Sequence, residues 1–411
     1  MLFRYGSDSK GRPVKKAVIY TKNEHGISRD KIDFDALYII DQLKAFGYEA
    51  YIVGGAVRDL LIGKEPKDFD IVTDATPTKI KKIFRNSRVI GRRFRLVHVF
   101  FDSKVFEVST FRSISDGSVG NRFGSMDEDV QRRDFTLNAL YFDVQKEQVI
   151  DYVGGVNDIR KCKVKPIIAK EIIFQEDPVR MLRAIKYAAT TGCGLSYSLK
   201  RHIRRSAYLL SPVSPSRLTE ELLKIINSGY AYDIVKLALD MDLYMYLQPA
   251  ATALIYASKK FEQNYFNHLK ELDSLHKKHH DARLGQKLFY LIYDFAKGLT
   301  DWKKEVQKNT AVAELYSLAW GYCRSFVLPM NPQRVELEFA VRLVLRDLGV
   351  AVNLTKKNQS QEVVQKDFSV ASKKAKNSHV AKGKGVPSRR KRKSCNSTAK
   401  IPEITTKPAL I

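Results

Sequence analysis

The chain has 411 residues, four scattered cysteines and a formal net charge of +26 at pH 7, with a sequence pI of about 9.7. A charge this positive indicates a polyanionic partner, either nucleic acid or an anionic membrane surface, and the length allows two or three domains. The cysteine spacing argues against a disulfide framework or a zinc site, and the lack of a long apolar run or an apolar leader predicts a cytoplasmic protein whose partner is not a membrane.

The N-terminal third alternates between strand-like and helix-like patterns. Residues 1–31 are polar and basic with little periodicity, which predicts a flexible arm. Residues 32–155 form the predicted head, and within it residues 32–46 have helical spacing. The clearest β-hairpin runs over residues 96–110. Glycine and serine dominate residues 113–125 and predict a mobile loop.

Beyond residue 155 the pattern is helical. We expect a helical neck over residues 156–230 and a helical body over residues 231–350. In the neck, Asp177 is a predicted helix cap, Pro178 takes the first helical position, and Gly192 marks the end of that helix.

The last segment, residues 351–411, has few large apolar residues and many lysines, serines and asparagines. It cannot bury enough apolar surface to offset its chain entropy, so it predicts a disordered tail. The basic run at residues 389–393 raises affinity for RNA without specificity, or it is a nuclear targeting signal.

Two aspartates one residue apart give the strongest functional signal. Asp68 and Asp70 lie in a predicted strand, so the side-chain period of two places both carboxylates on one face. Adjacent carboxylates repel each other unless they are neutralised, most commonly by a pair of Mg²⁺ ions that also bind substrate phosphates. Upstream, Gly54 and Gly55 mark a turn from strand to helix, where backbone N–H groups can hold a phosphate. Together these features predict nucleotidyl transfer.

Nucleotidyl transfer often uses a third carboxylate, and the sequence offers two candidates. Glu107 lies on the polar face of the predicted hairpin, where it is either catalytic or an ordinary exposed strand residue. Asp134 follows Arg132 and Arg133, so it is either catalytic or an orienting partner for those arginines. The pattern does not separate the two candidates.

Arginines near the acidic strand are candidates for triphosphate binding. Arg132 and Arg133 are adjacent, and Arg58 lies on the helix that follows the glycine turn. A guanidinium binds phosphate bidentately, which suits a triphosphate clamp. A surface charge pair is the other interpretation.

A second acidic and basic pair lies in the neck. Asp177 and Arg180 are three residues apart on one helix and share a face. They form either an ion pair within the helix or a base-recognition pair. In the second case the carboxylate accepts from the amine of adenine or cytosine while the arginine donates to the ring nitrogen, an order that guanine and uracil reverse. Arg183, one turn further, can reach the same pocket.

Basic and aromatic residues interleave in the segment just before the predicted hairpin. Arg92, Arg93 and Arg95 flank Phe94 there. This pattern suits single-stranded RNA, although a basic surface strand has the same composition.

The order of these motifs resembles the superfamily of class II tRNA nucleotidyltransferases and bacterial poly(A) polymerases over roughly residues 35–230. The matching segments are residues 54–59, 67–70, 132–138, 151–155, 176–180 and 216–220. Within this superfamily, residues 89–99 resemble the signature of the poly(A) polymerase branch.

The resemblance implies an α+β protein: a nucleotidyltransferase head of the polymerase-beta type with a mixed sheet, followed by all-α neck, body and leg regions. It implies Mg²⁺ at Asp68 and Asp70, an active-site role for Asp134, and base selection in the neck by Asp177 and Arg180. Further nucleotide contacts are implied at Gly54, Gly55, Arg58, Arg132, Arg133, Asn138 and Arg183, and an RNA contact at Arg217.

The function that follows from the resemblance is template-independent transfer of AMP from ATP to single-stranded RNA 3′ ends, with release of pyrophosphate. RNA-degradation machinery is a candidate partner. The first alternative is a CCA-adding or A-adding enzyme that acts on tRNA, because it shares every catalytic motif. A catalytically silent RNA-binding protein is the second alternative, and the intact carboxylates argue against it.

Overall fold

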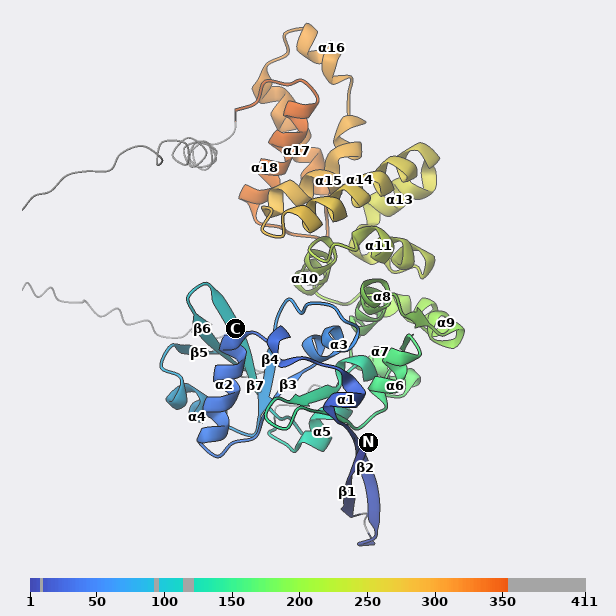
Figure 1. Ribbon diagram of the computed structural model, residues 1–411. Helices are drawn as coiled ribbons and strands as arrows, with labels where there is room; N and C mark the ends of the chain where they lie inside the picture. The colour runs from blue at the N-terminus through green and yellow to red at the C-terminus, as the bar shows by residue number, and fades with distance from the viewer. Residues whose placement is uncertain (8–9, 92–95, 114–121, 354–411) are drawn as a thin grey trace, which may run out of the picture. The chain divides into compact units, whose positions relative to one another are not determined.

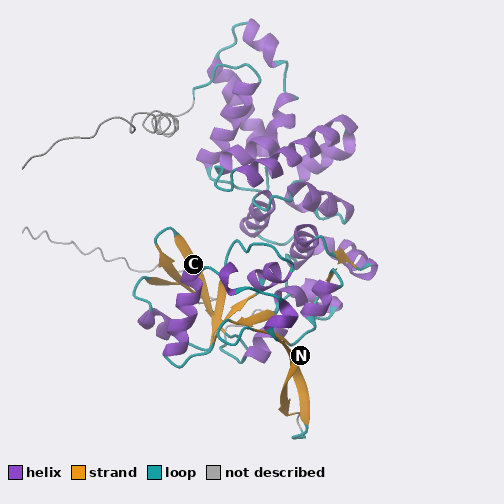
Figure 2. Cartoon of the chain, in the orientation of Figure 1, coloured by secondary structure: helices purple, strands orange, loops and turns teal. Residues whose placement is uncertain are grey.

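A computed structural model of the chain describes residues 1–7, 10–91, 96–113 and 122–353 (Figure 1). The predicted disordered tail from residue 354 onward, most of the predicted mobile loop, and Arg92, Arg93 and Arg95 lie outside the described residues, while Val352, which the tail prediction includes, is buried. The last strand of the described chain ends at Leu195, and beyond it every regular element is a helix (Figure 2).

The head is built on a nine-stranded mixed sheet. All neighbouring strands are antiparallel except β4 and β7, which run parallel, so the predicted mixed sheet is confirmed. In spatial order the strands are β1 (Leu2–Ser7), β2 (Pro13–Tyr20), β9 (Gln148–Asp151), β8 (Leu140–Asp143), β3 (Ala50–Val53), β4 (Asp70–Thr73), β7 (Lys104–Thr110), β6 (Leu96–Phe101) and β5 (Ser87–Ile90).

Different helices cover the two faces of this sheet. Ile52 and Ile71 belong to a core formed with four helices, while Val72 and Tyr141 belong to a second core formed with a single helix on the opposite face. The four helices are α2 (Phe34–Ala45), α3 (Gly55–Leu61), α4 (Pro77–Ile83) and α6 (Gly155–Arg160), and the single one is α5 (Met126–Gln131). The head also contains α1 (Lys22–His25) and 3₁₀ turns at Arg29–Lys31 and Thr136–Asn138.

The prediction of a flexible arm over residues 1–31 is wrong. Strands β1 and β2 form a hairpin that extends the sheet by pairing with β9, and Ala17 and Tyr20 of β2 are buried. The apolar alternation is short, and the outward residues are basic. Lys16, for example, pairs with Asp127 at 2.6 Å, so its charge belongs to a folded surface.

The neck and body form one large apolar core. Their helices are α7 (Lys170–Glu176), α8 (Arg180–Thr191), α9 (Tyr197–Ser206), α10 (Pro215–Ile226), α11 (Ala231–Asp240), α12 (Tyr244–Leu247), α13 (Pro249–Ala257), α14 (Lys259–Lys278), α15 (Leu284–Lys297), α16 (Trp302–Gln307), α17 (Val312–Phe326) and α18 (Arg334–Asp347), with a 3₁₀ turn at Ala207–Leu210. The expectation of helices alone beyond residue 155 needs one correction, since β10 (Lys163–Val164) and β11 (Gly194–Leu195) form a small parallel sheet.

Helix α8 begins two residues later than predicted. Pro178 and Val179 form a turn before it, and the Asp177 side chain accepts a hydrogen bond from the Val179 backbone N–H at 3.2 Å. The helix ends at Gly192, which has φ +74° and therefore stops the helix without the strain another residue would carry.

Candidate active site

A cleft of about 1360 Å³ collects most of the residues that the sequence marks. Its walls come from the head and from the neck helices α8 and α10. The predicted site residues that line it are Gly54, Gly55, Arg58, Asp68, Asp70, Arg132, Arg133, Asp134, Asn138, Asp177, Arg180, Arg183 and Arg217. Glu107 is not among the residues that line the cleft.

The two aspartates lie where β4 begins. Asp70 is the first residue of the strand, and Asp68 precedes it by two residues, so both carboxylates open into the cleft. Phe69 and Ile71 turn the other way into the core of the head, as the alternation predicts.

Asp70 is reachable by solvent in the cleft, but the protein displaces much of the surrounding water. This desolvation raises the pKa of Asp70 to about 6, with further contributions from the negative charges of Glu107 and Asp68, while Arg133 opposes the shift. A raised pKa marks a carboxylate whose charge is incompletely balanced by the protein. Together with the neighbouring carboxylate of Asp68, it forms a suitable oxygen donor set for a hard divalent cation.

The two candidates for a third carboxylate lie in different surroundings. Ile71 of β4 pairs in parallel with Val108 of β7, so Glu107 is level with Asp70 on the adjacent strand and points to the same face. Asp134 instead lies 3.5 Å from the guanidinium of Arg183. Among the described residues, no three carboxylate, histidine or cysteine side chains converge closely enough to form a metal site by themselves.

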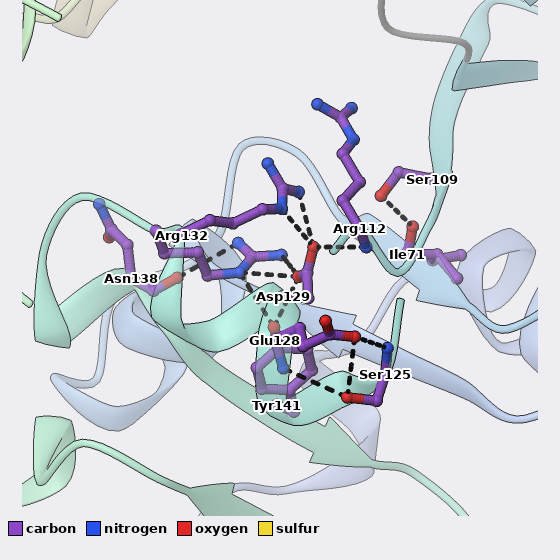
Figure 3. Close-up of polar contacts among 10 residues, drawn as sticks. Ile71, Ser109, Arg112, Ser125, Glu128, Asp129, Arg132, Asn138 and Tyr141 are labelled. Carbon is purple, nitrogen blue, oxygen red and sulfur yellow. Dashed lines mark hydrogen bonds and ion pairs between the residues drawn. The ribbon is translucent and has the colours of Figure 1, made fainter. Parts of the chain in front are cut away.

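Arg132 and Arg133 are both held by one buried carboxylate, that of Asp129 on α5 (Figure 3). Arg132 donates to Asp129 Oδ1 at 2.6 Å and Arg133 donates to Oδ2 at 2.9 Å, while Tyr141 donates its hydroxyl to Oδ2 at 2.7 Å. Burial alone would raise the pKa of Asp129, but these two arginines and the tyrosine overcome that effect and hold the pKa well below its usual range. Sequence analysis missed Asp129, although its spacing of three and four residues from the arginines was a readable signal.

A further arginine of the cleft, Arg112, was also missed. Its backbone N–H donates to Asp129 Oδ1 at 3.3 Å, while its side chain extends away from Asp129 (Figure 3). Burial and the nearby charge of Arg132 lower the pKa of Arg112 to about 10. The guanidinium groups of Arg112, Arg132 and Arg133 therefore concentrate positive charge in the cleft.

Arg58 connects the glycine turn to the other wall. It donates to Asn138 Oδ1 at 2.7 Å and lies over the ring of Tyr187 on α8, 5.5 Å from the ring centroid. Gly54, just before α3, has φ +76° and ψ −126°, a conformation that is essentially restricted to glycine. The glycine turn, Arg58 and Asn138 therefore line the cleft together.

Asp177 and Arg180 each have a partner of their own at the cleft. Arg217 of α10 donates to Asp177 Oδ2 at 2.6 Å, and Arg180 donates to Glu176 at 2.9 Å and to the Ile173 carbonyl at 3.3 Å. Both side chains are largely buried at the cleft. The ion pairs at this end of α8 are Arg217 with Asp177 and Arg180 with Glu176.

Lysines that the sequence analysis passed over also line the cleft. Lys186 lies three residues after Arg183 on the same face of α8, and burial lowers the pKa of its ammonium to about 8. Lys64 and Lys224 reach the cleft from a head loop and from α10. Helical spacing from Arg183 could have identified Lys186, but no sequence signal identifies Lys64 or Lys224.

Two protein families match this chain. Residues 50–165 match the family described as "Poly A polymerase head domain", and residues 195–255 match that described as "Probable RNA and SrmB-binding site of polymerase A". The first match contains the glycine turn, both aspartates and the arginine pair, and the second contains Arg217.

Individual relatives agree with these families. Poly(A) polymerase I of Escherichia coli O6:H1 is 44% identical over 253 residues, which cover 58% of this chain and 54% of that protein. The CCA-adding enzyme of Geobacillus kaustophilus is 37% identical over 218 residues, which cover 52% of this chain and 54% of that protein. The chain thus spans about half the length of the curated relatives it matches.

The fold has solved counterparts. The Bacillus stearothermophilus CCA-adding enzyme in complex with CTP superposes with a TM-score of 0.50 and 27% sequence identity, covering 76% of this chain and 81% of that chain. None of the helices in the described part of the chain is both long and apolar enough to span a membrane.

Proposed function

We propose that this chain, which belongs to the superfamily of bacterial poly(A) polymerases and tRNA nucleotidyltransferases, transfers AMP from ATP to RNA 3′ ends without a template. The proposal rests on one observation: Asp68 and Asp70 line the same cleft as the buried residues Asp177 and Arg180. The first pair suits phosphoryl chemistry, and the second pair suits reading one base.

Asp68 and Asp70 would hold Mg²⁺, with Glu107 as the third carboxylate at the same sheet face. When bound, the cation lowers the pKa of an RNA 3′ hydroxyl and neutralises charge on the departing pyrophosphate. The raised pKa of Asp70 and the strand register support this assignment of Glu107 over Asp134. Asp134 orients Arg183 instead.

The arginines orient and neutralise the triphosphate. Asp129 fixes Arg132 and Arg133, so their remaining N–H groups are preorganised and little side-chain entropy is lost when a phosphate binds. Arg58, fixed by Asn138, contributes from the glycine turn.

Base choice is made at the start of α8. Arg180, held by Glu176, would donate to the ring nitrogen of adenine, and Asp177 would accept from its amine. Guanine would instead place a carbonyl oxygen against the Asp177 carboxylate and a ring N–H against the Arg180 guanidinium, and these mismatches cost binding free energy. Cytosine presents the same order of groups, so Asp177 and Arg180 also suit a CCA-adding enzyme. Several relatives are named as such enzymes.

A primer-extension assay separates these two functions. Purified protein with Mg²⁺ receives each NTP separately, together with either an unstructured RNA or a tRNA that lacks its CCA end. We expect long ladders with ATP on both RNAs, and no product from Asp68→Asn. Addition that requires CTP and stops after three nucleotides on tRNA would replace polyadenylation with CCA addition.

A further inference from the structure

The head loop before β4, which contains Lys64 and Lys67, is hydrogen-bonded to residues of the neck and body. Lys67 immediately precedes Asp68, and its ammonium donates to the backbone carbonyls of Asn227 and Ser228 at 3.3 and 3.5 Å. The same Nζ lies 3.0 Å from Nε2 of His276 on α14. A residue adjacent to a proposed metal ligand is therefore bonded to a helix more than 200 residues away in the chain.

The other end of this loop is held in the same way. Lys64 donates to the backbone carbonyl of Thr190 at the end of α8 and to the hydroxyl of Tyr230 at 3.1 Å. Lys64 and Lys67 thus attach this loop to Thr190, Asn227, Ser228 and Tyr230, which line the cleft as well. Since Asp68 precedes the first paired residue of β4, the sheet alone does not fix its position.

The environment of His276 is difficult to explain by packing within the body alone. The residue is only 6% exposed. Among the described residues, its ring has one hydrogen bond, the one between Nε2 and Lys67, and its Nδ1 has no partner. An unpaired buried N–H carries a free-energy cost. Burial and the positive charges of Lys67 and Lys287 lower the pKa of His276 to about 4, so at neutral pH the ring is neutral and Nε2 accepts from Lys67.

The surrounding backbone is shaped to admit this ring. Gly229 lies in the connection between α10 and α11, and a Cβ at that position would come within 2.9 Å of the His276 ring. Lys287, itself only 5% exposed, donates to the Asn227 side chain at 2.7 Å and so fixes the connection that accepts from Lys67. The contact between Lys67 and His276 therefore depends on α14, on the connection between α10 and α11, and on Lys287 of α15.

We infer that Lys67 and His276 are positioning residues for the proposed reaction, through which α14 holds Asp68 at the geometry that catalysis requires. The inference rests on the proposed function, because it assigns Asp68 a catalytic position. A displacement of about 1 Å at a catalytic group can reduce turnover by two orders of magnitude. The body, which carries no catalytic carboxylate, would then control the rate through this contact.

The test compares three variants of α14. His276→Ala removes the acceptor, His276→Gln restores an acceptor at a similar position, and His268→Ala is the matched control. His268 lies on the same helix and bonds to Asp294 of the body at 2.7 Å, without contact to the head loop. Lys67→Met breaks the same bond from the head and serves if His276→Ala does not fold.

We expect His276→Ala to lower kcat about tenfold or more with the KM for ATP unchanged, His276→Gln to recover most of the loss, and His268→Ala to retain wild-type kcat. Amide hydrogen exchange over residues 64–70 should rise in His276→Ala only. Equal kcat and equal exchange in the two alanine variants would overturn the inference. If the wild type incorporates no nucleotide, the proposed function fails, and the exchange comparison still decides whether the contact orders the loop.

Discussion

At the scale of single residues, Asp129 supports the site without touching the reacting atoms. Its carboxylate balances two arginines and accepts a hydrogen bond from the Tyr141 hydroxyl. Asp129→Ala should lower the free energy of unfolding by about 3–5 kcal/mol, because it leaves adjacent guanidinium charges without their counterion. Urea unfolding measures this value, and Asp127→Ala on the same helix, which removes partly exposed contacts with Lys16 and Tyr152, should cost less than Asp129→Ala.

The same carboxylate predicts a pH dependence of stability. The folded state holds the pKa of Asp129 below its usual range, so the unfolded chain binds the proton first as the pH falls. The contribution of Asp129 is therefore complete above about pH 4 and is lost progressively below it. The stability difference between wild type and Asp129→Asn should narrow below about pH 4, and a constant difference down to pH 2 would contradict the assignment.

The pKa of Asp70 is raised, in contrast to that of Asp129, and this predicts that cation binding depends on pH. Because desolvation and two neighbouring carboxylates raise its pKa to about 6, protons compete with a cation for this group near neutral pH. The Mg²⁺ concentration that gives half-maximal AMP transfer should rise about tenfold for each pH unit below about 6. Titrations of activity against Mg²⁺ at several pH values measure this, and a constant half-maximal concentration between pH 5 and 7 would exclude Asp70 as a ligand.

At the scale of elements, the junction of α7 and α8 carries Asp177 and Arg180, the residues proposed to read the base. Asp177→Ala removes the acceptor for the adenine amine and leaves Arg217 without its 2.6 Å partner. The ratio of kcat/KM for ATP to that for GTP should fall at least about tenfold, since hydrogen bonds to charged groups contribute about 1.5–3 kcal/mol. Arg204→Ala on α9, an exposed arginine that does not line the cleft, is the control and should leave the ratio unchanged.

Elements with a local signal could be predicted from the sequence, and elements defined by distant pairing could not. The hairpin of β6 and β7 and the end of α8 at Gly192 follow from alternation and a helix stop. The attachment of β2 to β9 joins residues far apart in the chain, and its alternation is only a few residues long.

The same limit applies to the site. The motifs identified Asp68, Asp70 and Arg58, because their residue types and spacing are read locally. The bond from Arg217 to Asp177 spans 40 residues and the one from Lys67 to His276 spans 209, so neither leaves a periodic trace. Likewise, Cys162 and Cys193 are 31 residues apart, yet their free thiol sulfur atoms lie 2.8 Å from each other.

At the scale of the whole molecule, positive charge is divided between a structured cleft and the C-terminal segment. The cleft holds arginines and lysines together with the Asp68 and Asp70 carboxylates, which suits one nucleotide and one RNA end. Residues 354–411 contain 15 lysines and arginines against three acidic residues, without the motifs of the head. Specific chemistry and non-specific RNA affinity should therefore separate along the chain.

Removal of residues 354–411 tests that separation. Each phosphate neutralised on single-stranded RNA releases counterions and contributes about −0.7 to the slope of log K against log salt. The shortened chain should bind a long RNA more weakly and with a shallower salt slope, while kcat on a short primer at saturating ATP stays within about twofold of wild type. Fluorescence anisotropy across a salt series and single-nucleotide addition measure the two quantities. Equal salt slopes would place the RNA-binding charge in the described helices instead, and a large loss of kcat on the short primer would show that the segment takes part in catalysis.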